Sequence, residues 1–129
     1  MGRLGEVGLV NDAAFAETRA KRMASAGRSR RAISAHLAQK GIDAATVREA
    51  VPRDGAAELA AAIAFARKRR LGPFARDTEE MLSRDEKRAA ERKALGTMSR
   101  AGFDFGVCER VLRMSRDDAE ERLRDRREF

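Results

Sequence analysis

Residues that build covalent or catalytic sites are scarce in this sequence. Its 129 residues include one cysteine, one histidine and two prolines, and neither tryptophan nor tyrosine. A single cysteine permits no internal disulfide, which is typical of proteins of the reducing cytosol, so we expect a cytoplasmic location. The sequence has no glycine-rich phosphate loop, no Ser/His/Asp or Cys/His set and no cluster at metal-ligand spacing. We therefore predict a protein that is not an enzyme and has no catalytic residues, cofactor or metal.

Long hydrophobic runs are also missing. No stretch approaches the roughly 20 apolar residues that a membrane span requires, and residues 1 to 12 lack the apolar run of a signal peptide. We expect a soluble monomer without a membrane partner or a small-molecule substrate.

Charge and alanine dominate what is present. Lysine and arginine number 28 against 21 acidic residues, which gives a net charge of +7, and 38% of the residues are charged. A composition of this kind favours long solvated helices over sheet. We predict an all-α protein with a thin core, because many of the 43% hydrophobic residues are alanine.

Two segments of the sequence, residues 31–51 and 92–112, align without a gap. Each is predicted to form a helix, a tight turn and a second helix: a glycine ends the first helix in a left-handed conformation, an apolar residue follows, and an aspartate caps the second helix. The identities are Arg31 with Arg92, Gly41 with Gly102 and Asp43 with Asp104, and the apolar pairs are Leu37 with Met98, Ile42 with Phe103, Val47 with Cys108, Ala50 with Val111 and Val51 with Leu112.

A further helix precedes each hairpin. FAETRAKR at 15–22 lies over IAFARKRR at 63–70, which extends the repeat to three helices. We predict tandem three-helix repeats in an elongated, curved helical-repeat architecture. The expected parts are an N-terminal strap at 1–10, a three-helix repeat at 11–52, a second repeat at 53–113 with an inserted loop at 72–83, and a charged C-terminal helix or tail at 114–129.

Local signals set the expected helix boundaries. Gly27 ends a helix over 12–26, and Ser29, Asp54 and Ser83 are expected N-caps. Ser83 also has the spacing to Glu86 that a capping box requires.

Two stretches interrupt the repeat. The inserted loop carries Gly72-Pro73, which ends a helix, and 77–82 is expected to form at most one loose turn. In the C-terminal segment after Ser115 only Ala119, Leu123 and Phe129 are apolar, so we expect a frayed or weakly docked helix there.

His36 and Cys108 have ordinary interpretations. His36 lies between Ile33 and Leu37 in a helical pattern, without a cysteine or acidic partner at metal-ligand spacing. Cys108 occupies the repeat position of Val47, which favours a buried small hydrophobe over a nucleophile.

Basic clusters are the most suggestive feature for function. Four cations end the helix predicted over 55–71, where the helix dipole favours cations by about 0.3–1 kcal/mol each. The same dipole disfavours the three arginines at the start of the first hairpin, so we infer a basic surface that meets an acidic partner, either nucleic acid or protein. Single-strand binding is disfavoured because aromatic stacking residues are few. Chosen from charge alone, the candidate partner- or DNA-binding residues are Arg28, Arg30, Arg31, Lys40, Arg67, Lys68, Arg69 and Arg70.

Parts of the sequence resemble the RecX regulatory family. The residues that carry the resemblance are GLVNDAAFA at 8–16, Arg30-Arg31-Ala32-Ile33, LAQKGID at 37–43 and GFD at 102–104. Asn11 departs from the family's acidic residue, and the family has a further three-helix module before this block, where only Met1 to Val7 stand here. The resemblance implies a non-enzymatic modulator of RecA recombinase that binds the RecA–DNA filament and hinders ATP hydrolysis, strand exchange and co-protease activity.

Two other functions stay open at this point. The chain could be a basic helical module that binds DNA without RecA, which predicts a steep dependence of DNA affinity on salt. It could instead be an adaptor fragment that lacks its N-terminal repeat, since repeat arrays generally need about three units for stability.

Overall fold

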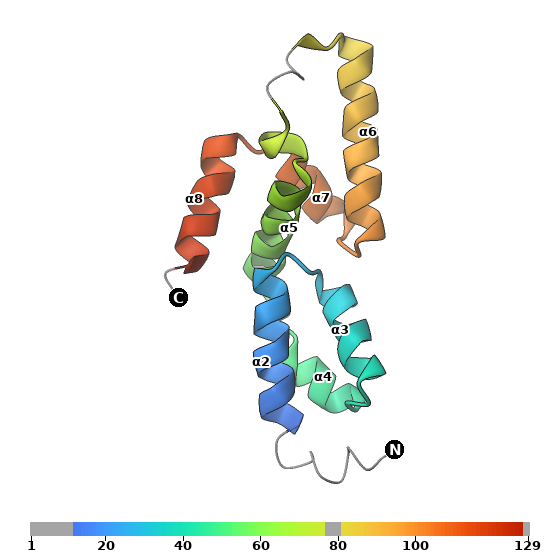
Figure 1. Ribbon diagram of the computed structural model, residues 1–129, viewed down its shortest axis with the longest axis vertical. Coiled ribbons are helices and arrows are strands. Elements are labelled where there is room, and N and C mark those ends of the chain that lie inside the picture. The colour runs from blue at the N-terminus through green and yellow to red at the C-terminus, as the bar shows by residue number, and fades with distance from the viewer. Residues whose placement is uncertain (1–11, 77–80, 128–129) are drawn as a thin grey trace.

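The computed structural model describes residues 12–76 and 81–127, and within these ranges it is all-α, with seven α-helices, one short 3-10 helix and no strand (Figure 1). The helices form two lobes along one long axis, which confirms the prediction of tandem three-helix units. The expected strap at 1–10 lies outside the described residues, and so does most of the loose turn expected at 77–82.

The first lobe consists of α2 (Asp12–Ser25), α3 (Arg30–Gln39) and α4 (Ala44–Ala50). The predicted caps are present: Ser29 Oγ accepts a hydrogen bond from the Ala32 N–H at 3.1 Å, and Asp43 Oδ1 accepts one from the Thr46 N–H at 2.8 Å. Gly41 has a φ of +87°, the left-handed conformation expected between the two helices of the hairpin. The core of this lobe consists of Ala16, Ala20, Met23, Ile33, Leu37, Ile42, Val47 and Val51.

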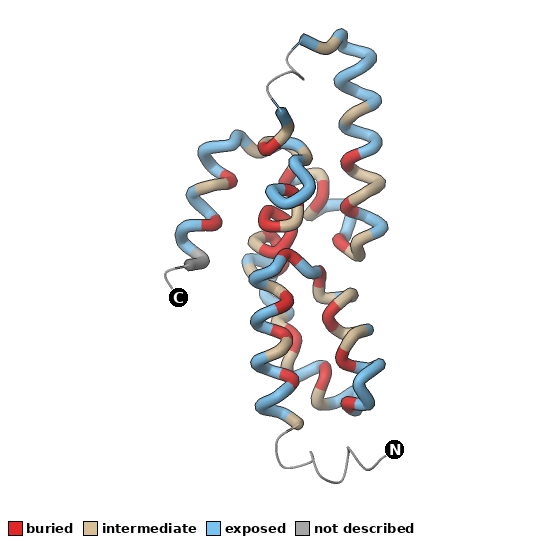
Figure 2. The backbone as a smooth tube through the Cα atoms, in the orientation of Figure 1, coloured by how far each residue is buried: buried red, intermediate tan, exposed pale blue. Residues whose placement is uncertain are grey.

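The second lobe repeats this arrangement with α5 (Gly55–Arg69), α6 (Arg84–Arg100) and α7 (Phe105–Leu112), and adds the 3-10 helix η1 (Gly72–Phe74). The Ser83 capping box with Glu86 is complete in both directions. A separate hydrophobic core fills this lobe, and its buried residues come from α5, η1, α6, α7 and the segment beyond (Figure 2).

The inserted segment lengthens α6 as well as forming a loop. Helix α3 has 10 residues and begins one residue before Arg31, whereas α6 has 17 and begins eight residues before the equivalent Arg92. The difference of seven residues amounts to about two helical turns, or about 10 Å. These extra turns are mostly exposed and stand at the end of the molecule, beyond the other helices (Figures 1 and 2).

The expectation of a frayed or weakly docked C-terminal helix is wrong, because one face of this helix is buried. Helix α8 (Arg116–Arg127) packs against α5 and η1. Its two apolar residues, Ala119 and Leu123, are 0% and 2% exposed and belong to the core of the second lobe. Because they are four residues apart, they lie on the same side of the helix. These two side chains dock a segment that is otherwise charged.

A joint of buried polar contacts connects the two lobes. Ser29 is fully buried, and its hydroxyl donates a hydrogen bond to the Ala101 carbonyl at 2.8 Å while it also caps α3. The turn before it packs against α5, where a Cβ on Gly27 would lie 2.9 Å from the Phe65 backbone nitrogen. The Phe65 ring in turn contacts Phe103, with centroids 5.6 Å apart. The α2–α3 turn of the first lobe is therefore held against α5 and the α6–α7 turn of the second.

Arg30 completes the joint with charge. Its backbone N–H donates to Glu58 Oε1 at 3.1 Å, and its guanidinium lies 3.9 Å from the same oxygen and 3.7 Å from Asp104 Oδ2. Arg31 lies 3.9 Å from the other oxygen of Asp104. The prediction that Asp104 caps α7 through its side chain is therefore wrong: the residue has the backbone conformation of an N-cap, but its carboxylate makes no capping hydrogen bond and pairs with the arginines.

The joint makes Gly27 less tolerant of a side chain than Gly41. Both glycines have a φ near +90°, so alanine costs each about 1 kcal/mol of backbone strain. A Cβ at Gly41 meets nothing within 4 Å, whereas at Gly27 it meets the α5 backbone. We expect Gly41→Ala to lower the free energy of unfolding by about 1 kcal/mol and Gly27→Ala by about 2–4 kcal/mol. Urea denaturation measures both, and equal losses would contradict the close approach of the lobes.

Glu58 gives the joint a pH dependence of known sign. Burial raises the pKa of Glu58 above its ordinary value of 4.5, and the hydrogen bond and charge of Arg30 offset this only in part. Because the folded-state pKa lies above the unfolded one, the group adds stability as the pH falls through the raised value, and the gain is complete below 4.5. We expect the wild type to gain stability relative to Glu58→Gln between pH 7 and pH 4.5. A stability difference that does not change with pH would refute the raised pKa.

Candidate interface: a cationic cleft in the second lobe

The eight cations predicted from charge do not form one continuous patch. Arg30 lies in the joint, where Glu58 and Asp104 meet its charge, so a partner would have to compete with these two carboxylates for it. Lys40 stands at the other end of α3, ten residues or about 15 Å from Arg30. Arg28 and Arg31 are exposed beside the joint.

The basic run at the end of α5 divides between two directions. Arg69 lies over the Phe65 ring, 5.2 Å from its centroid, and so flanks the joint. Lys68 is exposed. Arg67 and Arg70 face two hollows of the second lobe, and these hollows bring in cations that the sequence analysis did not single out.

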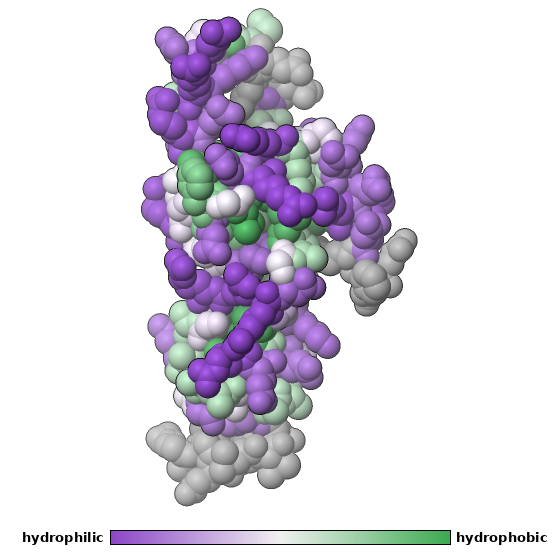
Figure 3. Space-filling view, turned by 180° about the vertical axis from the view of Figure 1, so that it is seen from behind, coloured by the Kyte–Doolittle hydropathy of each residue, from purple (hydrophilic) through white to green (hydrophobic). Residues whose placement is uncertain are grey.

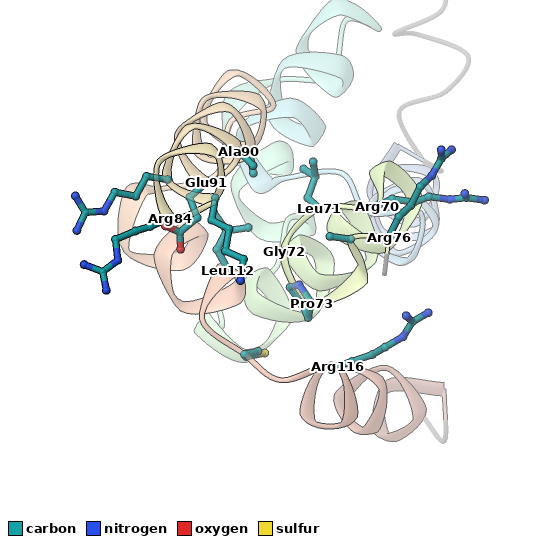
Figure 4. Close-up of a pocket in the computed structure, with 15 residues that line it drawn as sticks. Arg70, Leu71, Gly72, Pro73, Arg76, Arg84, Ala90, Glu91, Leu112 and Arg116 are labelled. Carbon is teal, nitrogen blue, oxygen red and sulfur yellow. The ribbon is translucent and has the colours of Figure 1, made fainter. Parts of the chain in front are cut away.

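The larger hollow is a cleft of about 850 Å³ between η1 and the N-terminal half of α6, closed below by the end of α7 (Figure 4). We call it the cationic cleft. Its apolar lining comes from Leu71, Gly72, Pro73, Ala75, Ala90, Ala94, Leu112 and Met114, and its charged lining from Arg70, Arg76, Arg84, Lys87, Arg88, Glu91 and Arg116. Six cations thus face one carboxylate.

The charges stand at the rim and the apolar groups lie between them. In Figure 4, Arg84 extends on one side of the cleft and Arg70, Arg76 and Arg116 on the other, with Leu71, Pro73 and Leu112 in the middle. More generally, the face seen in Figure 3 shows hydrophobic patches bordered by hydrophilic side chains. In the part of the chain that the structure describes, Arg116 is the only rim cation with an ion pair, to Glu120 at 3.5 Å on its own helix.

Helix electrostatics does not explain the cations on α6. Arg84 is the first residue of the helix, with Lys87 and Arg88 in the next turn, and the positive end of the helix dipole disfavours cations there. Asp85 and Glu86 satisfy that preference from other faces of the same turn. The helix dipole therefore gives no stabilising reason for these three cations.

A second hollow of about 480 Å³ continues the basic surface around η1, between α5 and α8. It shares Arg70, Arg76 and Arg116 with the cationic cleft and adds Arg67. A smaller groove of about 360 Å³ between α6 and α7 continues from Arg88 and Leu112 on the other side. The cationic surface thus covers two neighbouring hollows around η1, and the third adjoins them with mixed charge.

Sequence reasoning missed most of the cleft residues. The sequence analysis places these cations in the inserted loop or in charged helices and assigns them no role: Arg76, Arg84, Lys87, Arg88 and Arg116. One signal was available: positions 84, 87, 88 and 91 follow the i, i+3, i+4, i+7 spacing of a single helical face. Their proximity to η1 and α8 is a tertiary property that this spacing does not reveal.

The remaining candidates for chemistry agree with their ordinary interpretations. Cys108 is fully buried, its Sγ lies 3.6 Å from the Phe103 carbonyl, and burial raises the pKa of the thiol, which opposes a reactive thiolate. Partial burial, together with the charges of Arg19, Lys40 and Arg28, lowers the pKa of His36. Among the described residues no group of acidic, histidine or cysteine side chains could hold a metal, and no helix is long and apolar enough to cross a membrane.

Arg70 has a φ of +56°, the left-handed conformation that glycine usually occupies at this end of a helix. An arginine at this position carries about 1 kcal/mol of strain that glycine avoids. We expect Arg70→Gly to be about 1 kcal/mol more stable than Arg70→Ala, although both remove the same charge from the rim. Chemical denaturation of the two variants measures the difference, and an equal or inverted order would argue against strain at this residue.

Comparison with known proteins places this architecture in a family. Residues 11–51, the first lobe, match the family model described as RecX, second three-helix domain. No solved structure matches the chain.

Curated relatives extend the match over both lobes. The chain is 36% identical to a regulatory protein RecX of Myxococcus xanthus over 87% of its own length, 38% identical to that of Thermobifida fusca over 88%, and 34% identical to that of Agrobacterium fabrum over 90%. It spans 58%, 57% and 58% of these relatives, so it covers somewhat more than half of each. A helical hairpin repeated around glycine turns, matched along nearly the whole chain by proteins of one name, shows that this chain belongs to the RecX family of regulatory proteins.

Proposed function

We propose that the chain is a non-enzymatic inhibitor of RecA recombinase, which binds the RecA–DNA filament in the cytoplasm and slows its ATPase, strand-exchange and co-protease activities during DNA repair. The observation that supports this most strongly is the 36% identity to a regulatory protein RecX over 87% of the chain. A net charge of +7 and a cleft with six cations at its rim suit a partner that is itself strongly acidic.

The contact surface that we assign to this function is centred on the second lobe. Arg67 and Arg70 keep their predicted role there, and Arg76, Arg84, Lys87, Arg88 and Arg116 join them. Arg28, Arg31, Lys40, Lys68 and Arg69 remain proposed outer contacts, because all are exposed. Rim charges of this kind act mainly on the association rate and on its salt dependence.

The test is the RecA ATPase on single-stranded DNA with increasing amounts of this chain. We expect the wild type to inhibit, and the triple variant Arg84→Glu, Lys87→Glu, Arg88→Glu to need on the order of tenfold more protein for the same inhibition. Acidic residues at the start of a helix are favoured by its dipole, so α6 should remain folded in this variant.

A matched control reverses the same number of charges elsewhere. Lys21, Arg22 and Arg48 are exposed on α2 and α4 and line none of the hollows of the second lobe. Lys21→Glu, Arg22→Glu, Arg48→Glu should therefore inhibit nearly as well as the wild type. Absence of inhibition by saturating wild-type protein would remove the proposed function, and equal losses in the two triple variants would remove the assignment to the second lobe.

The net positive charge favours one second candidate, a DNA-binding module that acts without RecA. This alternative predicts that bare DNA binds as tightly as the RecA–DNA filament. It also predicts a linear fall of log affinity with log salt, with a slope of about −0.7 per neutralised phosphate on single strands. Fluorescence anisotropy with naked and RecA-coated DNA at several salt concentrations separates the two functions.

A further inference from the structure

The floor of the cationic cleft is apolar and partly open to solvent. Leu71, Pro73 and Leu112 are each half-buried and line it together. On the η1 side Gly72 packs directly against Leu112, since a Cβ on the glycine would come within 2.7 Å of the Leu112 Cδ2. These apolar side chains line a cleft of about 850 Å³ together. Covering such a surface with an apolar group is favourable, because it removes apolar area from water.

The rim sets the charge of whatever covers this floor. Cations stand on both walls, Arg84 on one and Arg70, Arg76 and Arg116 on the other (Figure 4). Their side chains extend outward from the cleft and not into its centre, so they would meet the flanks of a ligand. A ligand with an apolar strip and acidic flanks matches both features.

Two kinds of acidic macromolecule could meet these cations, a nucleic acid or a protein segment. Single-stranded nucleic acid is usually held by aromatic side chains on which its bases stack. No aromatic side chain of the described residues lines the cleft, and Phe74 beneath the neighbouring hollow is only 5% exposed. An aliphatic floor instead suits the leucine-like face of a short amphipathic helix laid into a groove.

We propose that the cationic cleft binds an acidic amphipathic helical segment of a partner protein, with its apolar face on Leu71 and Leu112 and its carboxylates on the rim. If the proposed function holds, the segment belongs to a subunit of the recombinase filament, and in this sense the inference rests on that function. The binding chemistry itself depends only on this chain. It requires both the floor and the rim, whereas a site for polyanions requires the rim alone.

The probe is a fluorescein-labelled 14-residue helical peptide with leucine at i, i+4, i+7 and i+11 and glutamate on the remaining faces. Two comparison probes have the same number of negative charges without the apolar strip: a glutamate peptide with serine in place of leucine, and an oligothymidylate. Fluorescence anisotropy at 150 mM salt gives each affinity for the full chain. We expect the leucine peptide to bind at least tenfold more tightly than either comparison probe.

Variants of the floor and of the rim separate the two requirements. Ala90 lines the cleft, whereas Ala89 is exposed on another side of α6 and does not line it. Ala90→Gln places a longer polar side chain over the floor and should weaken the leucine peptide about tenfold, while Ala89→Gln should leave its affinity within twofold. The Arg84→Glu, Lys87→Glu, Arg88→Glu variant should weaken all acidic probes. Circular dichroism confirms that the variants remain helical.

Three outcomes would overturn the inference. These are no binding of the leucine peptide at 100 μM, equal affinity for the leucine peptide and the oligothymidylate, and equal effects of Ala89→Gln and Ala90→Gln. Equal affinity with a response to the rim variant alone would identify a nucleic-acid or general polyanion site. The RecA ATPase assay reports on the proposed function independently. If the chain inhibits RecA but fails the peptide test, the proposed function stands and the inference about the cleft is refuted.

Discussion

The contact on which the rest of the structure depends is the buried hydroxyl of Ser29. It caps α3 by accepting from Ala32 and joins the lobes by donating to the Ala101 carbonyl. Both roles are filled at 0% exposure, where an unsatisfied hydroxyl or carbonyl would cost about 1–3 kcal/mol. The start of one helix and the end of another therefore depend on the same atom. With Glu58 and Arg30 beside it, this atom links the turns through which the two lobes, each with its own hydrophobic core, meet.

Much of the fold could be predicted from the sequence because it follows local rules. Glycines at 27, 41 and 102 adopt the left-handed conformation that ends a helix, and Ser29, Asp43, Asp54 and Ser83 cap the helices that follow. Such interactions involve residues two to four positions apart, so their signals lie within a short stretch of sequence.

The errors concern residues whose partners are distant in the sequence. Asp104 has the position and the backbone of a cap, yet arginines more than 70 residues away take its carboxylate. The scarcity of apolar residues in α8 predicts weak docking, whereas Ala119 and Leu123 belong to the core of the second lobe and α8 packs against α5. The cationic cleft is of the same kind: the face on α6 is visible in the spacing, but its opposite wall comes from η1 and α8. Only the packing of the lobe shows that these cations share one cleft.

The additional turns of α6 make the two lobes unequal. In the first lobe α3 begins at the joint and has no additional N-terminal turns. The wall that α6 supplies to the cationic cleft therefore has no counterpart in that lobe. A duplicated fold would ordinarily offer duplicated binding faces. Here the longer α6, together with η1 and α8, breaks the internal symmetry, so the walls of the cationic cleft have no equivalent in the described part of the first lobe. Under the proposed function, a molecule that binds through this one cleft would occupy one position on the filament and would not crosslink neighbouring positions, so its effect would scale with the number of molecules bound.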